Sequence, residues 1–173
     1  MEALVEQTLV TPMLEEFRAE VETTQRVLER IPAEKLTWKP HSKSMSLGQL
    51  AWHVATIPGG ISRIAQQSSF DVSQGNFVPS QPSSKAEILQ AFEQSRRDGE
   101  AFLQGLTDRQ AVESWRLLNR GAEVFVRPRI GIVRTIMLNH WYHHRGQLSV
   151  YLRLLEVPVP IIYGRSADEN PFN

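Results

Sequence analysis

The chain carries, near its C-terminus, the stretch His140-Trp141-Tyr142-His143-His144-Arg145-Gly146-Gln147-Leu148, which holds three of its five histidines. The stretch also has the spacing of a helix with one buried face, so some of its imidazoles are predicted to point toward the core. Two histidines at positions i and i+4 lie on one helix face and can bind one metal ion. Such a site needs a third ligand, and the best candidate is His53 in an earlier amphipathic stretch.

Helical geometry separates the three histidines of this stretch. With about 100° of rotation per residue and His140 as the origin, the apolar stripe of the helix centres near +20°, and His144 falls at about +40°. His143 falls at about −60°, at the shoulder of the stripe, and Arg145 at about 140°, away from it. We therefore predict that His140 and His144 face inward and that His143 is a boundary or surface residue. Two core histidines bonded to carbonyls are the alternative, which a third available histidine disfavours.

His53 passes the same test in the earlier helix. It lies three residues after Leu50 and four before Ile57, so it shares their inward face. Ser46 followed by Gln49 is the pattern of a capping box, which predicts that this helix begins just before the apolar run.

Composition narrows the class of protein. Nineteen basic residues balance nineteen acidic ones, so there is no electrostatic case for a nucleic-acid partner. The absence of cysteine excludes disulfides, thiolate ligands and a protein-borne thiol nucleophile, and it fits a cytoplasmic protein. The N-terminus lacks the pattern of a signal peptide, and no apolar run approaches the roughly 20 residues of a membrane span. The length predicts a single domain over residues 1–173.

Four amphipathic segments predict helices, at about residues 12–31, 46–67, 84–106 and 129–156. Pro58 with the two glycines after it is expected to kink or interrupt the second helix. Residues 68–83 are polar and without periodicity, which predicts a long connection. Two short β-prone runs within residues 115–126 flank an Asn-Arg-Gly turn and predict a small hairpin.

These elements predict an all-α protein, a four-helix bundle with a long crossover connection and a small β-hairpin insertion before the fourth helix. The connection of roughly sixteen residues is long enough to return the chain to its starting end, so the second and third helices could run parallel. Metal sites in bundles form between facing helices, so His53 on the second helix and the histidine pair on the fourth suit this fold.

The C-terminal segment, residues 157–164, is too apolar to extend freely into water. We expect it to pack on the bundle or to form part of a subunit contact. Arg145 points away from the metal stripe and two carboxylates follow downstream, so a positioning ion pair of Arg145 with Asp168 or Glu169 is expected. Gly146 is predicted to permit close approach of a neighbouring helix.

Three segments of the chain share the pattern of a known family. They are Ser46-Leu47-Gly48-Gln49-Leu50-Ala51-Trp52-His53-Val54-Ala55, Asn139-His140 through His144-Arg145-Gly146-Gln147-Leu148, and Pro158-Val159-Pro160 with Tyr163-Gly164 and Ser166-Ala167-Asp168-Glu169. Together they resemble the DinB-like superfamily, which includes YfiT-type metal-dependent hydrolases and bacterial thiol transferases. The resemblance implies an up-down-down-up four-helix bundle that forms a homodimer. It also implies a divalent metal held, by position, at His53, His140 and His144.

Three neutral imidazoles would leave the full positive charge on the metal and keep coordination positions open, which activates a bound water or thiol. Zinc and nickel suit imidazole best, with iron and manganese as alternatives. Because the chain has no cysteine, any sulfur nucleophile must come from a low-molecular-weight thiol. We expect a metal-dependent enzyme acting on a small molecule, a thiol S-transferase or a hydrolase, with no catalytic residue identified. The alternative is a non-catalytic metal-binding stress-response bundle.

Two polar side chains lie on the inward face beyond His144. Gln147 and Tyr151 could each orient a ligand or a water molecule; alternatively, Gln147 bonds a histidine Nδ1 and Tyr151 only packs. The tryptophans at 38, 52 and 141 are predicted to be packing or interface residues.

Overall fold

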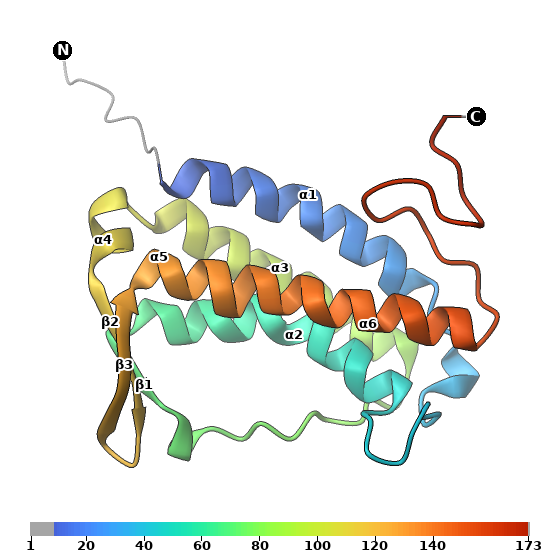
Figure 1. Ribbon diagram of the computed structural model, residues 1–173, viewed down its shortest axis with the longest axis horizontal. Coiled ribbons are helices and arrows are strands. Elements are labelled where there is room, and N and C mark those ends of the chain that lie inside the picture. The colour runs from blue at the N-terminus through green and yellow to red at the C-terminus, as the bar shows by residue number, and fades with distance from the viewer. Residues whose placement is uncertain (1–8, 173) are drawn as a thin grey trace.

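The computed structural model describes residues 9–172, which are mostly helical with a small three-stranded sheet at one end (Figure 1). In chain order the elements are α1 (Val10–Glu29), the 3-10 turn η1 (Ala33–Lys35), α2 (Leu47–Gln66), β1 (Ser69–Asp71), the 3-10 turn η2 (Val72–Gln74), α3 (Lys85–Gly105), α4 (Asp108–Val112), β2 (Ser114–Asn119), β3 (Ala122–Pro128), α5 (Arg129–Ile132), the π-helical segment η3 (Val133–Asn139) and α6 (His140–Leu154). None of the helices in this described part is long and apolar enough to cross a membrane.

Four long helical stretches lie side by side, namely α1, α2, α3 and the continuous run from α5 through η3 to α6 (Figure 1). Helix α2 packs on α3 and α6, and α1 packs on the same two. All four segments predicted to be helical are helical. The capping box that begins α2 is also confirmed, because the Ser46 hydroxyl accepts from the Gln49 N–H at 3.1 Å and the Gln49 amide oxygen accepts from the Ser46 N–H at 3.0 Å.

Pro58 lies inside α2 and does not interrupt it, so of the two predicted effects, a kink or an interruption, the interruption is wrong. Because proline has no N–H, the carbonyl of Val54, four residues earlier, has no helical donor. The indole N–H of Trp141 donates to this oxygen instead, at 2.9 Å. The backbone N–H of Gly59 donates to Ser95 Oγ at 2.8 Å, and a Cβ at Gly59 would lie only 3.0 Å from the Ser95 Cα. Hydrogen bonds of residues around Pro58 thus join α2 to both α3 and α6.

The predicted hairpin is present, but the sheet is larger than predicted. Strands β2 and β3 pair antiparallel, and φ values of 51° at Arg120 and 78° at Gly121 form the turn between them. Strand β1 comes from the connection that we predicted to be patternless, and it pairs parallel with β2. The Asp71 carboxylate at its end accepts the N–H groups of Arg120 at 3.0 Å and Gly121 at 2.7 Å. The fold is therefore mostly helical rather than all-α.

The buried face of α6 differs from the predicted stripe. Its fully buried side chains are Trp141, Arg145, Leu148 and Leu152. The π-helical segment η3 immediately precedes α6, and i→i+5 hydrogen bonds place more than 3.6 residues in a turn. An extrapolation at 100° per residue across this segment is therefore wrong, and His140 and His144 lie half-buried beside the core face. Gly146 is exposed, and a Cβ there would meet nothing within 4 Å, so the predicted close helix approach at this residue is also wrong.

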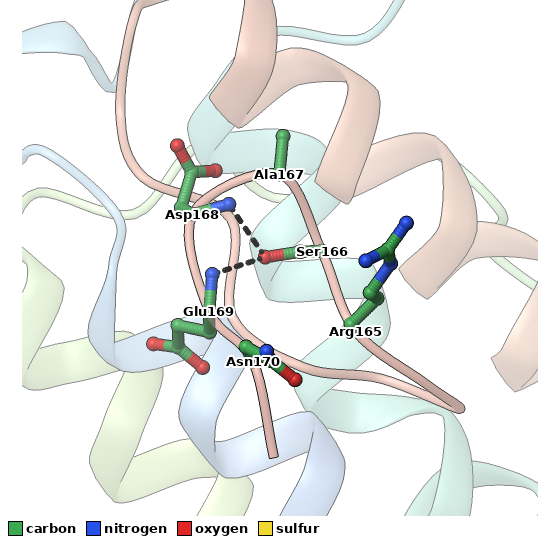
Figure 2. Close-up of a pocket in the computed structure, with 6 residues that line it drawn as sticks. All are labelled: Arg165, Ser166, Ala167, Asp168, Glu169 and Asn170. Carbon is green, nitrogen blue, oxygen red and sulfur yellow. Dashed lines mark hydrogen bonds between the residues drawn. The ribbon is translucent and has the colours of Figure 1, made fainter. Parts of the chain in front are cut away.

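The C-terminal segment packs on the helices, which confirms packing on the bundle, the first of the two predicted alternatives. Apolar side chains at Val157, Val159 and Ile162 contact the core. Asp168 pairs with Arg153 of α6 at 2.5 Å, and Glu169 pairs with Arg30, at the end of α1, at 2.5 Å. Within the segment, Ser166 Oγ accepts the backbone N–H groups of both acidic residues (Figure 2). Residues Arg165–Asn170 line the hollow drawn in Figure 2.

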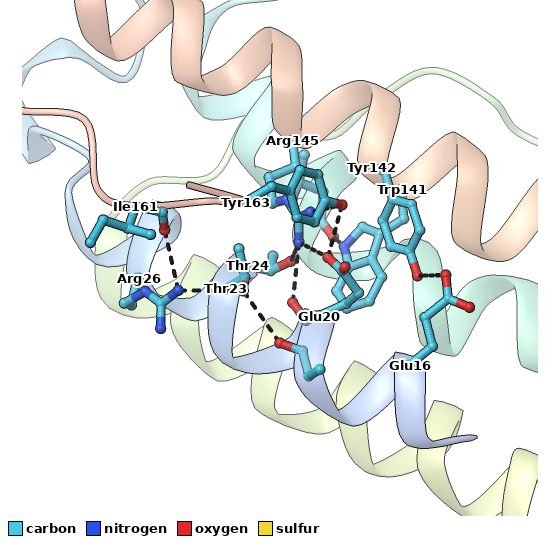
Figure 3. A network of polar contacts seen from close by, with 12 residues as sticks. Glu16, Glu20, Thr23, Thr24, Arg26, Trp141, Tyr142, Arg145, Ile161 and Tyr163 are labelled. Atoms are coloured by element: carbon cyan, nitrogen blue, oxygen red, sulfur yellow. Dashed lines mark hydrogen bonds and ion pairs between the residues drawn. The ribbon is translucent and has the colours of Figure 1, made fainter. Parts of the chain in front are cut away.

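Arg145 does not pair with Asp168 or Glu169, so that prediction is wrong. The residue is 1% exposed and faces α1 instead of solvent. Its guanidinium pairs with Glu20 at 2.5 Å and donates to Thr24 Oγ1 at 3.0 Å and to the Tyr163 hydroxyl at 2.5 Å (Figure 3). The segment's contact with Arg145 is therefore made by Tyr163.

Candidate metal centre

His53 of α2 and the histidine pair of α6 bring their ring nitrogens together. His140 Nε2 lies 3.3 Å from His53 Nε2 and 2.7 Å from His144 Nε2. One nitrogen from each ring lies within 4.8 Å of the other two. Two ligands on a tetrahedral ion with bonds of about 2.0–2.1 Å lie about 3.3 Å apart, so the three rings fit one divalent cation after small adjustments. Among residues 9–172 no carboxylate or further histidine joins the group.

Two features of the helices set this arrangement. His140 and His144 are four residues apart in α6 and therefore share a helix face. Helix α2 packs against that helix, and the Trp141–Val54 hydrogen bond joins the two residues that directly follow His140 and His53. The orientation of α2 against α6 is thus fixed one residue away from the cluster.

Hydrogen bonds to the rings favour the tautomer that a metal needs. His144 Nδ1 lies 2.8 Å from the Gln147 side-chain oxygen, which can only accept. The proton therefore resides on Nδ1, and Nε2 presents its lone pair to the cluster. His140 also bonds the backbone carbonyl of Ile136. Metal-ligating histidines are typically held in this way through the nitrogen that does not bind the metal.

Burial lowers the pKa of all three histidines. The pKa of His53 falls from 6.5 to about 4 because of burial and, to a lesser extent, the neighbouring His144 and His140. Burial is also the main cause of the lowered pKa of His140 and of His144. At neutral pH the three rings are therefore uncharged, which is the form that binds a metal.

Two hollows are each lined by part of the histidine cluster. The first, here the Trp52 pocket, has a volume of about 490 Å³ and is lined by Trp52, His53, Thr56, His140 and residues 76–80. The second, here the Tyr151 pocket, has a volume of about 450 Å³ and is lined by Lys43, Ser44, Met45, His144, Gln147, Val150 and Tyr151. Small molecules can thus approach the histidines through either hollow.

The remaining candidate residues take simpler positions. His143 is exposed and lies outside the cluster, with its ring centroid 4.9 Å from that of His144. Gln147 bonds His144 Nδ1, which was one of its two predicted roles. The Tyr151 hydroxyl donates to the Met45 carbonyl at 3.2 Å, and its ring packs edge-on against Trp38, so this residue mainly packs.

Sequence reasoning missed the segment that closes one side of the Trp52 pocket. Residues 76–80 belong to the connection that we predicted to be patternless. The available signal was the apolar pair Phe77-Val78 within an otherwise polar stretch. An apolar pair that no helix or strand requires is a candidate for ligand contact.

The sequence model of the DinB family matches residues 5–170. The chain belongs to the DinB family. YrdA, an uncharacterized protein of Bacillus subtilis strain 168, is 29% identical over 161 residues, which cover 90% of this chain and 89% of YrdA.

Solved structures of DinB-like proteins share the fold. One from Bacillus cereus ATCC 10987 aligns with 87% of this chain and 95% of its own, at 25% identity and a TM-score of 0.67. YjoA of Bacillus subtilis aligns with 90% of this chain and 100% of its own, at 18% identity and a TM-score of 0.69. The resemblance predicted from the three sequence segments is confirmed at the level of the DinB family.

Proposed function

We propose that this DinB-family protein is a metal-dependent enzyme that acts on a small molecule, as a thiol S-transferase or a hydrolase. The metal would be held by His53, His140 and His144. The supporting observation is that three uncharged imidazoles converge where two hollows meet, with no fourth protein ligand among the described residues. Sites with three protein ligands keep a position for an exogenous ligand. When bound, a divalent cation lowers the pKa of a ligated water, to about 7 at zinc, or of a thiol.

The chain's own residues would orient and enclose the reactants. Gln147 holds the His144 ring through Nδ1, and the Trp141–Val54 bond holds the two helices in register. The chain contains no cysteine, so in a transferase the thiol would be a low-molecular-weight co-substrate. Zinc or nickel suits three imidazoles best, with iron and manganese as alternatives.

The proposal extends to the assembly. The packing of the long helices and the DinB membership support an up-down-down-up four-helix bundle that forms one domain over residues 1–173. A homodimer is proposed from the family resemblance, and a cytoplasmic location from the cysteine-free composition.

Metal analysis followed by an activity screen tests the proposal. The purified protein should contain one equivalent of a divalent metal per chain. Activity against pairs of a thiol and an electrophile, or against activated esters and amides, should vanish on chelation and return when metal is restored. The His144→Ala variant should lack both metal and activity. Stoichiometric metal without any turnover would favour the non-catalytic alternative, and turnover unchanged in metal-free protein would contradict the metal mechanism.

A further inference from the structure

The Trp52 pocket combines two of the three histidines with an apolar rim. Trp52 precedes His53 on α2, and Phe77, Val78 and Pro79 come from the connection between η2 and α3. Phe77 is 66% exposed and Val78 is 75% exposed. Apolar surface that faces water contributes binding free energy when a ligand covers it. The rim can therefore favour molecules that carry an apolar group.

Specific contacts hold this rim beside the histidines. The Gln49 side chain of α2 donates to the Pro79 carbonyl at 3.3 Å. The Phe77 ring packs edge-on against Phe70 with centroids 6.4 Å apart. A Cβ at Gly75 would lie 2.5 Å from Phe77 Cζ, so the ring rests directly over the glycine backbone. Glycine at position 75 therefore allows Phe77 to occupy its place at the pocket.

The Tyr151 pocket is less suited to a molecule whose polar end must reach the whole histidine cluster. Only His144 of the cluster lines it, and the other nitrogen of that ring is already engaged by Gln147. Its lining includes the cationic side chain of Lys43, whereas no charged side chain among residues 9–172 lines the Trp52 pocket.

We propose that the Trp52 pocket binds an aromatic or branched aliphatic group of the small-molecule substrate, against Trp52, Phe77 and Val78. The polar, reacting end of the same molecule lies at the three histidines. A volume of about 490 Å³ suits a small organic molecule. This inference rests on the proposed function, because the polar end is held at the metal.

Two hydroxamates of different size serve as probes on the metal-loaded protein. Acetohydroxamate and benzohydroxamate share one metal-binding group and differ in a methyl against a phenyl. Calorimetric titration should show benzohydroxamate binding about tenfold more tightly. Phe77→Ser and Val78→Ser should each lower this ratio several-fold and leave acetohydroxamate binding unchanged. Gly75→Ala should also lower it, because the new Cβ displaces the Phe77 ring without changing its chemistry.

Val150→Ser is the matched control. Val150 is 56% exposed and lines the Tyr151 pocket, so it resembles Val78 on the other side of the cluster. The ratio should not change in this variant. A ratio that falls in Val150→Ser and not in Phe77→Ser would place the apolar group in the Tyr151 pocket and overturn the inference.

The remaining outcomes separate the two proposals. Bound metal and acetohydroxamate binding, with a ratio that no variant at the Trp52 pocket changes, would overturn this inference and leave the proposed function intact. Absence of stoichiometric metal would overturn the proposed function and this inference with it.

Discussion

Trp141 of α6 donates its indole N–H to the backbone carbonyl of Val54 in α2 at 2.9 Å. The carbonyl is available because Pro58, four residues later, has no N–H to offer it. Both partners directly follow histidines of the cluster, His140 and His53. The missing N–H of Pro58 therefore leaves free the carbonyl that Trp141 binds. This contact sets the distance between His53 and His140, two candidate ligands on different helices.

Replacing Trp141 by Phe should weaken both the fold and the metal site. The substitution leaves the Val54 carbonyl buried without its donor, which costs about 1–3 kcal/mol of unfolding free energy. Loss of the bond should also lower metal affinity, because His53 is then held less firmly against His140. Urea unfolding and metal titration measure the two effects. Trp38→Phe, which changes a tryptophan packed on Tyr151 away from Val54, should leave metal affinity unchanged; equal losses of affinity in both variants would contradict this explanation.

Metal binding should require all three clustered histidines and not His143. Changing His53, His140 or His144 to Ala removes one of the converging nitrogens and should abolish stoichiometric metal. His143→Ala is the matched control, because His143 lies on the same helix but is exposed and outside the cluster. Elemental analysis of the four purified variants gives the answer. Equal loss of metal from His143→Ala and His144→Ala would mean that the ligand set is wrong.

Gln147 should tune the metal site without being a ligand. Its side-chain oxygen accepts from His144 Nδ1 at 2.8 Å, so Gln147→Leu should lower metal affinity by about tenfold. Gln147→Glu retains an acceptor, so the metal affinity of this variant should at least equal that of the native protein. Competition with a chromophoric chelator measures both. Equal affinities in the Leu and Glu variants would show that this hydrogen bond does not support the ligand.

Spacing within one helix was sufficient to pair His140 with His144, because a helix repeats its faces whatever its neighbours do, although the predicted centre of the buried stripe was wrong. The pair His140 and His144 and the inward position of His53 follow from spacing within single helices. The orientation of Arg145 does not follow from spacing, because it depends on the π-helical segment before α6. No residue pattern of the chain indicates that change of hydrogen bonding. Strand β1 was missed for a different reason, because its three residues become a strand only by pairing with the hairpin.

The buried Arg145–Glu20 pair should be much more important for stability than a surface pair. Glu20→Ala leaves the guanidinium buried without its carboxylate, which costs about 3–5 kcal/mol. Glu100→Ala removes the partner of Arg18 in an exposed pair on α1 and α3 and should cost about 0–1 kcal/mol. Chemical denaturation compares the two. Similar losses would mean that the remaining native contacts of Arg145, with Thr24 Oγ1 and the Tyr163 hydroxyl, are sufficient for the buried guanidinium.

Acid should destabilise the metal-free protein through the clustered histidines. The pKa of His53 is about 4 in the folded chain against an ordinary value of 6.5, so the unfolded chain binds a proton first as the pH falls. The contribution of the uncharged His53 ring to folding stability is complete above about pH 6.5 and is lost progressively between about pH 6.5 and pH 4. The lowered pKa values of His140 and His144 act in the same direction. With a chelator present, the melting temperature should therefore fall between pH 7 and pH 5.

Carboxylates also titrate near the end of this range, so the histidine contribution is isolated by comparing variants. In His53→Gln the fall in melting temperature between pH 7 and pH 5 should be smaller than in the native protein, because one depressed pKa is gone. His41→Gln changes an exposed loop histidine and should leave the fall unchanged. Saturating metal should enlarge the difference in melting temperature between pH 7 and pH 5, since protons compete with the ion for the same nitrogens. An identical fall in His53→Gln and the native protein would show that His53 is as readily protonated in the folded chain as in the unfolded one.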